Sequence, residues 1–394
     1  MEQTSKVSFE DTAIAFEYKS DKALRKANLI FSLVNHPWIS AMATGLVKFA
    51  LKAGLPVEGM IKKTVFDHFC GGESIAESEK AITILSRYGV GTILDYSVEG
   101  EKSEDGFDRT TSEIIRTIER AKESRSVPFS VFKVTGIAST ELLEKIHGKQ
   151  QLTIDEVDAY ERVRKRVLAI CEAAGLHQVP VLVDAEETWI QDPIDALAYE
   201  MMGRFNTGKA IVFNTYQLYR TASLQNFRKA AATASQKNYF LGAKLVRGAY
   251  MEKERDRAEK MGYPSPIHPD KESTDKAFNE ALLFATQTLD RVAVMCGSHN
   301  EMSNQYLTSL MEKQQVKNSD ERVWFAQLFG MSDNISFNLA KAGYNVAKYV
   351  PYGPVHAVMP YLFRRAEENT SVAGQSSREL VLLKREVDRR KGRR

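Results

Sequence analysis

From Gly89 onward the chain alternates short apolar, β-branched runs with long amphipathic segments, and this alternation limits the fold more than any other feature. A parallel strand needs a long crossover to bring the chain back, so short strands joined by helices indicate parallel βα units. Eight such runs predict a (β/α)8 barrel, an α/β fold. The predicted strands are residues 92–96, 129–134, 179–184, 210–214, 241–246, 293–296, 324–328 and 345–350.

Helical segments separate these strands, because their apolar residues recur at three- and four-residue spacing. A doubly wound sheet is the alternative arrangement of the same units. It normally carries a G-x-G-x-x-G turn for a dinucleotide, but Gly89 and Gly91 are followed by Leu94 where the third glycine would stand. The barrel is therefore preferred. The predicted helices are residues 110–123, 154–174, 193–205, 216–237, 275–289, 303–313 and 332–341.

Residues 1–88 contain helical patterns and no strand-like run, so they predict an N-terminal helical extension. Its helices are expected over residues 22–34, 38–53 and 74–86. The predicted organisation has three regions: an N-terminal helical region over 1–88, a catalytic barrel over 89–369 and a basic tail over 370–394.

The net charge of +3 at pH 7 is concentrated in that tail. Residues 384–394 carry a local charge of +5, which leaves about −2 for the rest of the chain. A nucleic-acid enzyme normally spreads positive charge along a groove with interleaved aromatic residues, and the sequence has no such stripe. Nucleic acid is therefore not an expected partner.

Cysteine spacing and the first residues bear on the compartment. Cys70, Cys171 and Cys296 are odd in number and widely spaced, which argues against a disulfide framework or a cysteine-rich zinc site. Residues 1–11 include acidic side chains and lead into no apolar core, unlike a secretory signal or a mitochondrial presequence. The apolar stretch 39–60 is interrupted by charges, so no spanning helix is expected. The sequence predicts a cytoplasmic protein.

Polar residues follow most of the predicted strands, at the end of a barrel where enzymes carry their chemistry. A single such residue is usually a solvated charge, a helix cap or a structural histidine. Polar ends on strand after strand, all on one side of the barrel, are not expected from independent surface decoration. The residues concerned are Lys133, Asp184, Asn214, Arg247, Ser298, His299, Asn300, Gln327 and Tyr349.

Tyr361, Arg364, Arg365 and Glu368 stand at i, i+3, i+4 and i+7, so they share one face of the last barrel helix. The alternative interpretation is an exposed helix with an ordinary Arg364–Glu368 pair worth about 0.3–0.5 kcal/mol. If the helix overhangs the barrel mouth, the two guanidinium groups bind a small carboxylate through charge-assisted hydrogen bonds worth roughly 1.5–3 kcal/mol each. Lys133 adds a third cation. The expected ligand is a small acid with an apolar body.

Asp184 can offset this positive charge or, together with Glu186 and His299, bind a metal. His-x-His and H-E-x-x-H spacings are absent, and a metal ion would be repelled by the nearby lysine and arginine residues. We therefore predict no metal site. A metal-dependent barrel lyase or hydrolase and a catalytically silent membrane-associated scaffold remain the alternative functions.

Longer runs surround these residues: VDAE at 183–186, KLVRGAY at 244–250, SHN at 298–300, QLFGM at 327–331, YVPYG at 349–353, YLFRR at 361–365 and EN at 368–369. Together they resemble the proline dehydrogenase family, flavoenzymes that oxidise L-proline to Δ1-pyrroline-5-carboxylate in the first step of proline catabolism. The length of the chain accommodates only this oxidase, as in members with a single function, and the Lys and Arg at residues 244 and 247 resemble those of the eukaryotic-like branch. The resemblance implies a distorted (β/α)8 TIM barrel that holds FAD at the carboxyl ends of its strands.

The resemblance also implies roles for the site residues. Asp184 and Lys244 are expected to be catalytic, with Asp184 organising the side of the site near Lys133 and the flavin. The expected substrate-binding residues are Lys133, Leu328, Tyr349, Tyr361, Arg364, Arg365 and Glu368. The expected FAD-binding residues are Ala185, Asn214, Val246, Arg247, Gly248, Ala249, Tyr250, Ser298, His299 and Asn300.

Two positions bear on differences within the family. Many bacterial members have Arg where this chain has Lys244 and Lys where it has Arg247, and Lys lacks the planar fork of Arg. Tyr349 is expected to crowd the ring position where 4-hydroxyproline carries its hydroxyl group, which favours proline. A hydroxyproline dehydrogenase is the alternative within the same class.

By the same resemblance, electrons pass from the flavin to a membrane quinone. Leu380, Leu383 and Val387 lie near one helical face beside the basic residues. This pattern predicts peripheral docking on the inner membrane, at about 1 kcal/mol for each engaged basic residue. A solvated terminus is the alternative.

Overall fold

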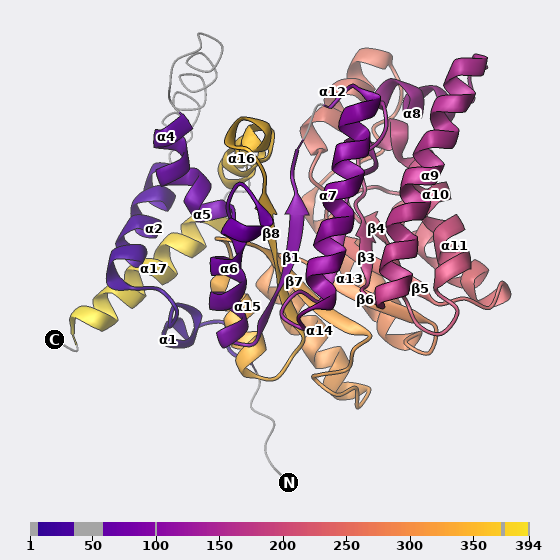
Figure 1. Ribbon diagram of the computed structural model, residues 1–394. Coiled ribbons are helices and arrows are strands. Elements are labelled where there is room, and N and C mark those ends of the chain that lie inside the picture. The colour runs from indigo at the N-terminus through magenta and orange to yellow at the C-terminus, as the bar shows by residue number, and fades with distance from the viewer. Residues whose placement is uncertain (1–6, 35–57, 99–100, 372–374, 393–394) are drawn as a thin grey trace. The chain divides into compact units, whose positions relative to one another are not determined.

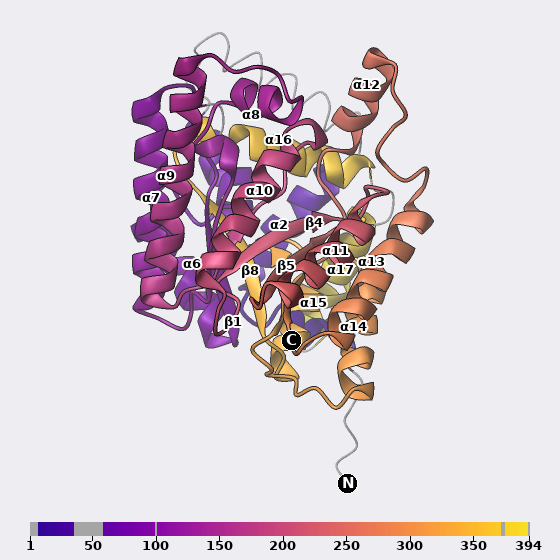
Figure 2. The same ribbon diagram turned by 90° about the vertical axis from the view of Figure 1, so that its right-hand side faces the viewer.

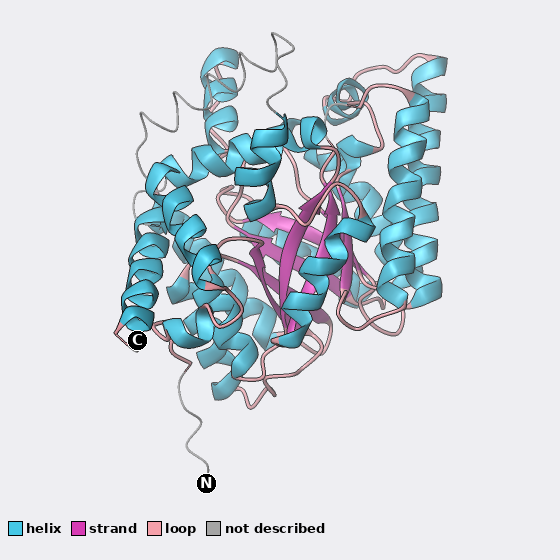
Figure 3. Cartoon of the chain, turned by 60° about the vertical axis from the view of Figure 1, so that its left-hand side comes forward, coloured by secondary structure: helices cyan, strands magenta, loops and turns pink. Residues whose placement is uncertain are grey.

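The computed structural model describes residues 7–34, 58–98, 101–371 and 375–392. Within these ranges eight strands form a closed barrel in sequence order, and helices connect them (Figure 3). The fold is the predicted (β/α)8 barrel preceded by helices. The strands are β1 (Val90–Tyr96), β2 (Phe129–Phe132), β3 (Val181–Val183), β4 (Val212–Gln217), β5 (Leu241–Val246), β6 (Val292–Gly297), β7 (Val323–Leu328) and β8 (Val346–Tyr352).

The helices of the described residues are α1 (Thr12–Ala15), α2 (Asp21–Val34), α4 (Glu58–Ile61), α5 (Asp67–Phe69), α6 (Ile75–Arg87), α7 (Glu104–Lys122), α8 (Thr140–His147), α9 (Ile154–His177), α10 (Thr188–Phe205), α11 (Ser223–Gln236), α12 (Met251–Met261), α13 (Lys271–Gln287), α14 (Glu301–Lys313), α15 (Asp333–Lys341), α16 (Val355–Ser371) and α17 (Gln375–Lys391). A π-helical turn (Lys62–Phe66) and a 3-10 turn (Val134–Gly136) complete them.

Several predicted boundaries were wrong, and the one at β4 bears most on the site. Residues 216–217 were assigned to a helix, but β4 continues through Gln217, and α11 begins only at Ser223. The strand continues because Tyr216 and Gln217 pair with Leu245 and Val246 of β5, a tertiary pairing that local periodicity cannot reveal. The sequence did not predict α8 and α12, and the helix predicted over residues 38–53 lies outside the described residues.

Side-chain caps begin several barrel helices. The Ser103 hydroxyl accepts a hydrogen bond from the Gly106 amide at the start of α7. At α9, Thr153 and Glu156 form a reciprocal capping box in which each side chain accepts from the backbone amide of the other. Such caps satisfy amide groups that the first turn leaves unpaired, so they define where each helix begins.

The chain divides into two compact units. The central unit comprises Ile93–Tyr96 and Gly100–Ala326, and the terminal unit comprises Met1–Thr92, Ser97–Glu99 and Gln327–Arg394. The region boundaries predicted after residues 88 and 369 stay predictions.

In the central unit, the pairing register shows which side chains point into the barrel. Neighbouring residues in a parallel register share a face, and successive residues along a strand alternate faces. Phe213 pairs with Leu182 and Gly242, and its ring meets the Phe129 ring edge-on at 5.5 Å. Trp324 meets Phe129 from another strand at 5.1 Å. These rings form an aromatic layer inside the barrel, while α7 and α9 lie side by side on its outer surface (Figure 2).

In the terminal unit, α17 lies beside α2, near the yellow and indigo ends of the colour scale (Figure 1). Leu382 and Leu383 are fully buried, and Leu380 and Val387 pack against the same apolar core. The apolar face of α17 that was predicted to contact a membrane, with Leu380, Leu383 and Val387, therefore packs against other helices of the protein. Among the described residues, every helix is too short or too polar to span a bilayer.

The basic residues of α17 have partners within the terminal unit. The buried Glu386 carboxylate binds the guanidinium groups of Arg389 and Arg390, each at 2.7 Å. Arg390 also reaches Asp21 at 3.1 Å, and Arg385 binds Glu10. Several of the tail charges thus tie α17 to the N-terminal segment.

Gly330 and Gly343 provide a matched test of packing in the terminal unit. Both have left-handed backbones, with φ of 78° and 82°. A Cβ atom at Gly330 would lie 2.3 Å from the His68 carbonyl oxygen, whereas one at Gly343 would meet nothing within 4 Å. Gly343→Ala should cost about 1 kcal/mol of unfolding free energy, from backbone strain alone. Gly330→Ala should cost roughly 3 kcal/mol or more, because backbone must also move. Urea unfolding of both variants checks this, and equal losses would contradict it.

Candidate active site

One layer above the aromatic rings, a row of polar side chains points into the barrel from β2 to β5. Asp184 directly follows β3, and its carboxylate accepts hydrogen bonds from Lys133 at 3.1 Å and from Lys244. Thr215 pairs with Lys244 in the strand register and donates to the Val183 carbonyl oxygen at 2.8 Å. The structure therefore brings together Lys133 and Asp184, which follow strands, and Lys244, which lies within β5.

The two ammonium groups keep Asp184 ionised. Burial by itself would raise the pKa of the Asp184 carboxyl group, but Lys244 and Lys133 lower that pKa to about 2. Burial lowers the pKa of Lys244, and Asp184 opposes this shift. Removing charged groups from water costs free energy. The attraction between the Asp184 carboxylate and the two ammonium groups offsets part of that cost.

Asp95 joins this row, although the sequence analysis did not single it out. Its carboxylate lies 4.0 Å from the Lys133 ammonium group, and the residue is 5% exposed. The available signal was an acidic residue near the carboxyl end of an otherwise apolar strand. Lys133 therefore lies between two carboxylates.

Behind Asp184, Glu186 ties the end of β3 to the end of β2. Its side chain accepts hydrogen bonds from the Thr135 amide at 3.0 Å and from the Thr135 hydroxyl group. The Gln191 side chain accepts from the Glu186 amide at 2.8 Å, and Gln217 donates to its carbonyl oxygen at 2.7 Å. Burial raises the pKa of Glu186 to about 7, even though both bonds from Thr135 oppose the shift. Ala185 lies within this bonded loop.

Arg247 follows β5 and is held rigidly. Its guanidinium group donates to Asp275 at 2.7 Å, to the Ser298 hydroxyl at 2.7 Å and to the Ser303 hydroxyl at 2.9 Å. The group also lies 4.4 Å from the centre of the Phe278 ring. Its side chain is still 22% exposed, so a cation with fixed orientation remains accessible at this end of the barrel.

Asn300 lies close to the same cation, because its amide donates to Ser298 at 3.1 Å while its side chain caps α14 at Ser303. A fixed guanidinium group, two hydroxyl groups and a helix N-terminus form a donor set suited to an anionic group such as a phosphate. His299 lies between Ser298 and Asn300 in the sequence and is half-buried.

The loop after β5 is shaped by a tyrosine. Gly248 has φ of 142°, and a Cβ atom there would lie 2.4 Å from the Tyr219 ring. Glycine is therefore needed because Tyr219 packs against it. Val246 pairs with the inward-facing Gln217, while Ala249 is exposed and Tyr250 is buried.

Asn214 is not brought to this site. It pairs with Val183 and Ala243, one residue out of phase with the inward row, so its side chain points toward α10. There its amide group donates to Asp195 at 2.8 Å. The inward-facing residues of β4 near its carboxyl end are Thr215 and Gln217, which the sequence analysis passed over. The cofactor contact assigned to Asn214 stays a prediction that this orientation does not favour.

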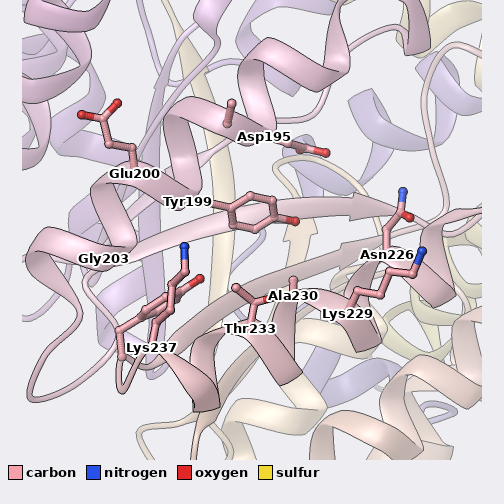
Figure 4. A pocket seen from close by; sticks show the side chains of 11 residues that line it. Asp195, Tyr199, Glu200, Gly203, Asn226, Lys229, Ala230, Thr233 and Lys237 are labelled. Atoms are coloured by element: carbon pink, nitrogen blue, oxygen red, sulfur yellow. The ribbon is translucent and has the colours of Figure 1, made fainter.

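A groove of about 630 Å3 lies on the outside of the central unit between α10 and α11. Figure 4 shows Tyr199 and Asp195 on one wall and Asn226, Lys229 and Thr233 on the other. Its walls come from the helical layer, so this groove is separate from the row of charges inside the barrel.

In the terminal unit, Tyr361 and Arg365 meet on α16 as their spacing predicts. The Arg365 guanidinium group lies 5.2 Å from the centre of the Tyr361 ring, and both residues are buried. Arg364 is half-buried. Glu368 belongs to α16, but its side chain lies outside the described part of the structure.

Leu328 and Tyr349 are also brought close together. The Phe329 amide, which follows Leu328, donates to the Tyr349 carbonyl oxygen at 2.8 Å. Leu328 is half-buried, and Tyr349 is 7% exposed. The carboxyl end of β7 is thus joined to the middle of β8.

In the described part of the chain, no group of three or more His, Cys, Asp or Glu side chains is arranged to hold a metal ion. The charges of the inward row are instead neutralised by lysines.

The comparisons with known proteins agree on one family. A family model described as Proline dehydrogenase matches residues 78–378. The chain is 32% identical to Proline dehydrogenase 1, mitochondrial, of Dictyostelium discoideum, over 96% of this chain and 74% of that protein. It is 34% identical to the carbapenem antibiotics biosynthesis protein CarD of Pectobacterium carotovorum subsp. carotovorum, over 84% of this chain and 86% of that one.

A solved structure shares the fold. Proline utilization A from Bdellovibrio bacteriovorus superposes with a TM-score of 0.72 at 20% identity. The match covers 94% of this chain but 40% of that one, so the chain spans less than half of that larger protein.

Glu186 makes stability depend on pH. Between about pH 4.5 and 7 the unfolded chain loses this proton while the folded protein keeps it, so stability falls as pH rises. The loss amounts to about 3 kcal/mol at most. Glu186→Gln should therefore gain unfolding free energy over the parent protein between pH 5 and pH 8.5, as measured by urea unfolding at both values. Glu252→Gln, which removes an exposed carboxylate from the first turn of α12, is the control and should show no such gain. A Glu186→Gln difference independent of pH would contradict the assignment.

Proposed function

The chain belongs to the proline dehydrogenase family, whose members oxidise proline with a flavin, and we propose that it converts L-proline to Δ1-pyrroline-5-carboxylate by hydride transfer to FAD. The observation that carries the proposal is the inward-facing Lys133–Asp184–Lys244 row, because it places fixed charges at the carboxyl ends of the strands. Fixed charges stabilise a reacting group without reorganising during the reaction.

The donors of the central unit fit FAD. Lys244 within β5 and Arg247 directly after that strand supply cations, and Ser298 and Asn300 lie beside Arg247. We assign the pyrophosphate to the Arg247 side and the ring system to the Lys244 side. When bound, FAD supplies the acceptor for the hydride that leaves C5 of proline.

The substrate carboxylate is assigned to Arg364, Arg365 and Lys133, and Glu368 is assigned as the partner of the arginines. Guanidinium groups suit this task because their planar forks match a carboxylate. Tyr361 already packs on Arg365, so it can present its ring beside the bound carboxylate. Tyr349 and Leu328 are assigned to the apolar face of the pyrrolidine ring.

The reaction also needs a neutral proline amine. Asp184 remains ionised at neutral pH and is shared between two lysines, so we assign it an electrostatic role rather than that of a proton acceptor. Orientation of the ring and exclusion of water are then expected to supply most of the rate.

The electron acceptor is proposed to be a membrane quinone. The apolar face of α17 is packed within the terminal unit, so any membrane contact must use other surfaces than Leu380, Leu383 and Val387. A cytoplasmic location with peripheral attachment to the inner membrane stays a prediction, as does the preference for proline over hydroxyproline.

The purified protein should be yellow, with a visible flavin absorption band. L-proline added without oxygen should bleach that band, because the hydride passes to the ring. Absorbance spectroscopy before and after addition checks this, with D-proline and trans-4-hydroxy-L-proline as comparisons. A colourless protein that becomes active only with a divalent metal would contradict the proposal.

Arg364→Ala should raise the KM for proline by about 10- to 200-fold, which corresponds to losing a charged hydrogen bond of roughly 1.5–3 kcal/mol. The flavin content, read from absorbance per protein, should not change. Arg385→Ala removes the same side chain from an exposed position and should leave KM as it was. If the main effect of Arg364→Ala is loss of flavin, its assignment to the substrate is wrong.

A further inference from the structure

We propose that Lys348 is a positioning residue that sets the apolar wall of the proline site, by holding the turn that carries Leu328 and the strand that carries Tyr349. This inference rests on the proposed function, in which Leu328 and Tyr349 contact the substrate ring. All the residues involved belong to the terminal unit.

Lys348 is an unusual residue for its position. It lies within β8 directly before Tyr349, and its side chain is 1% exposed. A lysine with no accessible surface pays a large desolvation penalty, whereas an apolar residue of similar length would fill the same space without it. The ammonium group therefore has to be explained by what it binds.

The ammonium group binds both ends of one turn. It lies 3.3 Å from the Leu328 carbonyl oxygen at the end of β7, and it donates to the Met331 carbonyl oxygen three residues later. It also forms an ion pair at 3.0 Å with Asp333, the first residue of α15. One cation thus fixes where β7 ends and where α15 begins.

Asp333 is anchored from the N-terminal segment. The Tyr18 hydroxyl group donates to it at 2.7 Å, and Lys19 lies 3.2 Å away. The Tyr18 ring stacks on Phe337 of α15 with its centre 4.6 Å from that ring. Burial acts to raise the pKa of the Asp333 carboxyl group, but Lys19 and Lys348 lower it below its usual range, so the ion pair with Lys348 persists at neutral pH.

Two further side chains hold the same turn. His68 contacts the Gly330 carbonyl oxygen at 3.1 Å, and Glu379 of α17 accepts from the Ser332 amide at 3.0 Å. The turn needs such support because Gly330 and Ser332 both have left-handed backbones, with φ of 78° and 50°. For serine this conformation is sparsely populated and persists only where its surroundings impose it.

The consequence reaches the substrate residues. Lys348 donates a hydrogen bond to the backbone carbonyl oxygen of Leu328 itself. The amide of the next residue, Phe329, donates to the carbonyl oxygen of Tyr349. Buried polar groups that specify one backbone arrangement are better understood as setting geometry than as adding stability. A misplacement of about 1 Å in a substrate wall lowers the rate of an enzyme by up to about a hundredfold.

Lys348→Met tests the inference in the full-length, flavin-loaded enzyme. It keeps the length of the side chain and removes its hydrogen-bond donors. We expect KM for proline to rise about tenfold, with flavin content unchanged. The preference for L-proline over trans-4-hydroxy-L-proline, measured as a ratio of kcat/KM values, should fall severalfold. Lys341→Met, an exposed substitution at the end of α15, is the control and should change neither quantity.

A double-mutant cycle with Leu328→Ala identifies the route of the effect. If Lys348 acts through Leu328, the double variant should have little more effect on KM than Leu328→Ala alone. Additive effects would show that Lys348 does not act through that wall and would overturn the inference. If Lys348→Met does not fold, Asp333→Asn removes the counter-charge with little change in shape and should raise KM in the same way.

The proposed substrate wall and the positioning role of Lys348 are tested separately by these variants. If Leu328→Ala leaves KM and the substrate ratio unchanged, the proposed substrate wall is wrong. If Leu328→Ala changes both while folded Lys348→Met lowers only the melting temperature, the wall stands and the positioning role of Lys348 is overturned.

Discussion

The shared carboxylate of Asp184 is the interaction on which the interior of the barrel depends. Lys133 and Lys244 both point inward, and without Asp184 the buried Lys244 would be an uncompensated cation while Lys133 would keep only Asp95, 4.0 Å away. Its chemistry follows from that role, since the same two lysines keep the carboxylate ionised. The same three side chains therefore balance charge inside the barrel and supply the fixed charges of the proposed substrate site.

The terminal unit uses the same device a second time. Lys348 and Asp333 are as buried as any pair in the described residues, and their partners come from segments far apart in the sequence. This arrangement explains why α1 and α17, at opposite ends of the chain, belong to one compact unit. The basic C-terminal residues thus contribute to internal structure, with Glu386 as their buried counter-charge.

Strand phase explains which site residues the sequence could identify. Lys133 and Asp184 end apolar runs and Lys244 lies within one, and the alternation of faces along the strands turns all three inward. Asn214 ends an apolar run as well, yet it falls on the opposite face because it is one residue out of phase with the inward-facing Thr215. A shift of one residue exchanges the faces of a strand, so the phase of the pairing decides whether a side chain reaches the site or the helix layer.

The sequence by itself determined the class of fold, the order of the strands and the family, because alternating strand and helix patterns and long runs of specific residues are local properties. It also placed Tyr361 and Arg365 on one face, since helical spacing is local too. Only the tertiary structure decided that Asp95 lies near Lys133 and that the apolar face of α17 is buried. It also decided that Lys348 binds the carbonyl oxygens of the turn after β7. These are contacts between distant segments, whose burial and charge partners exist only after the chain has folded.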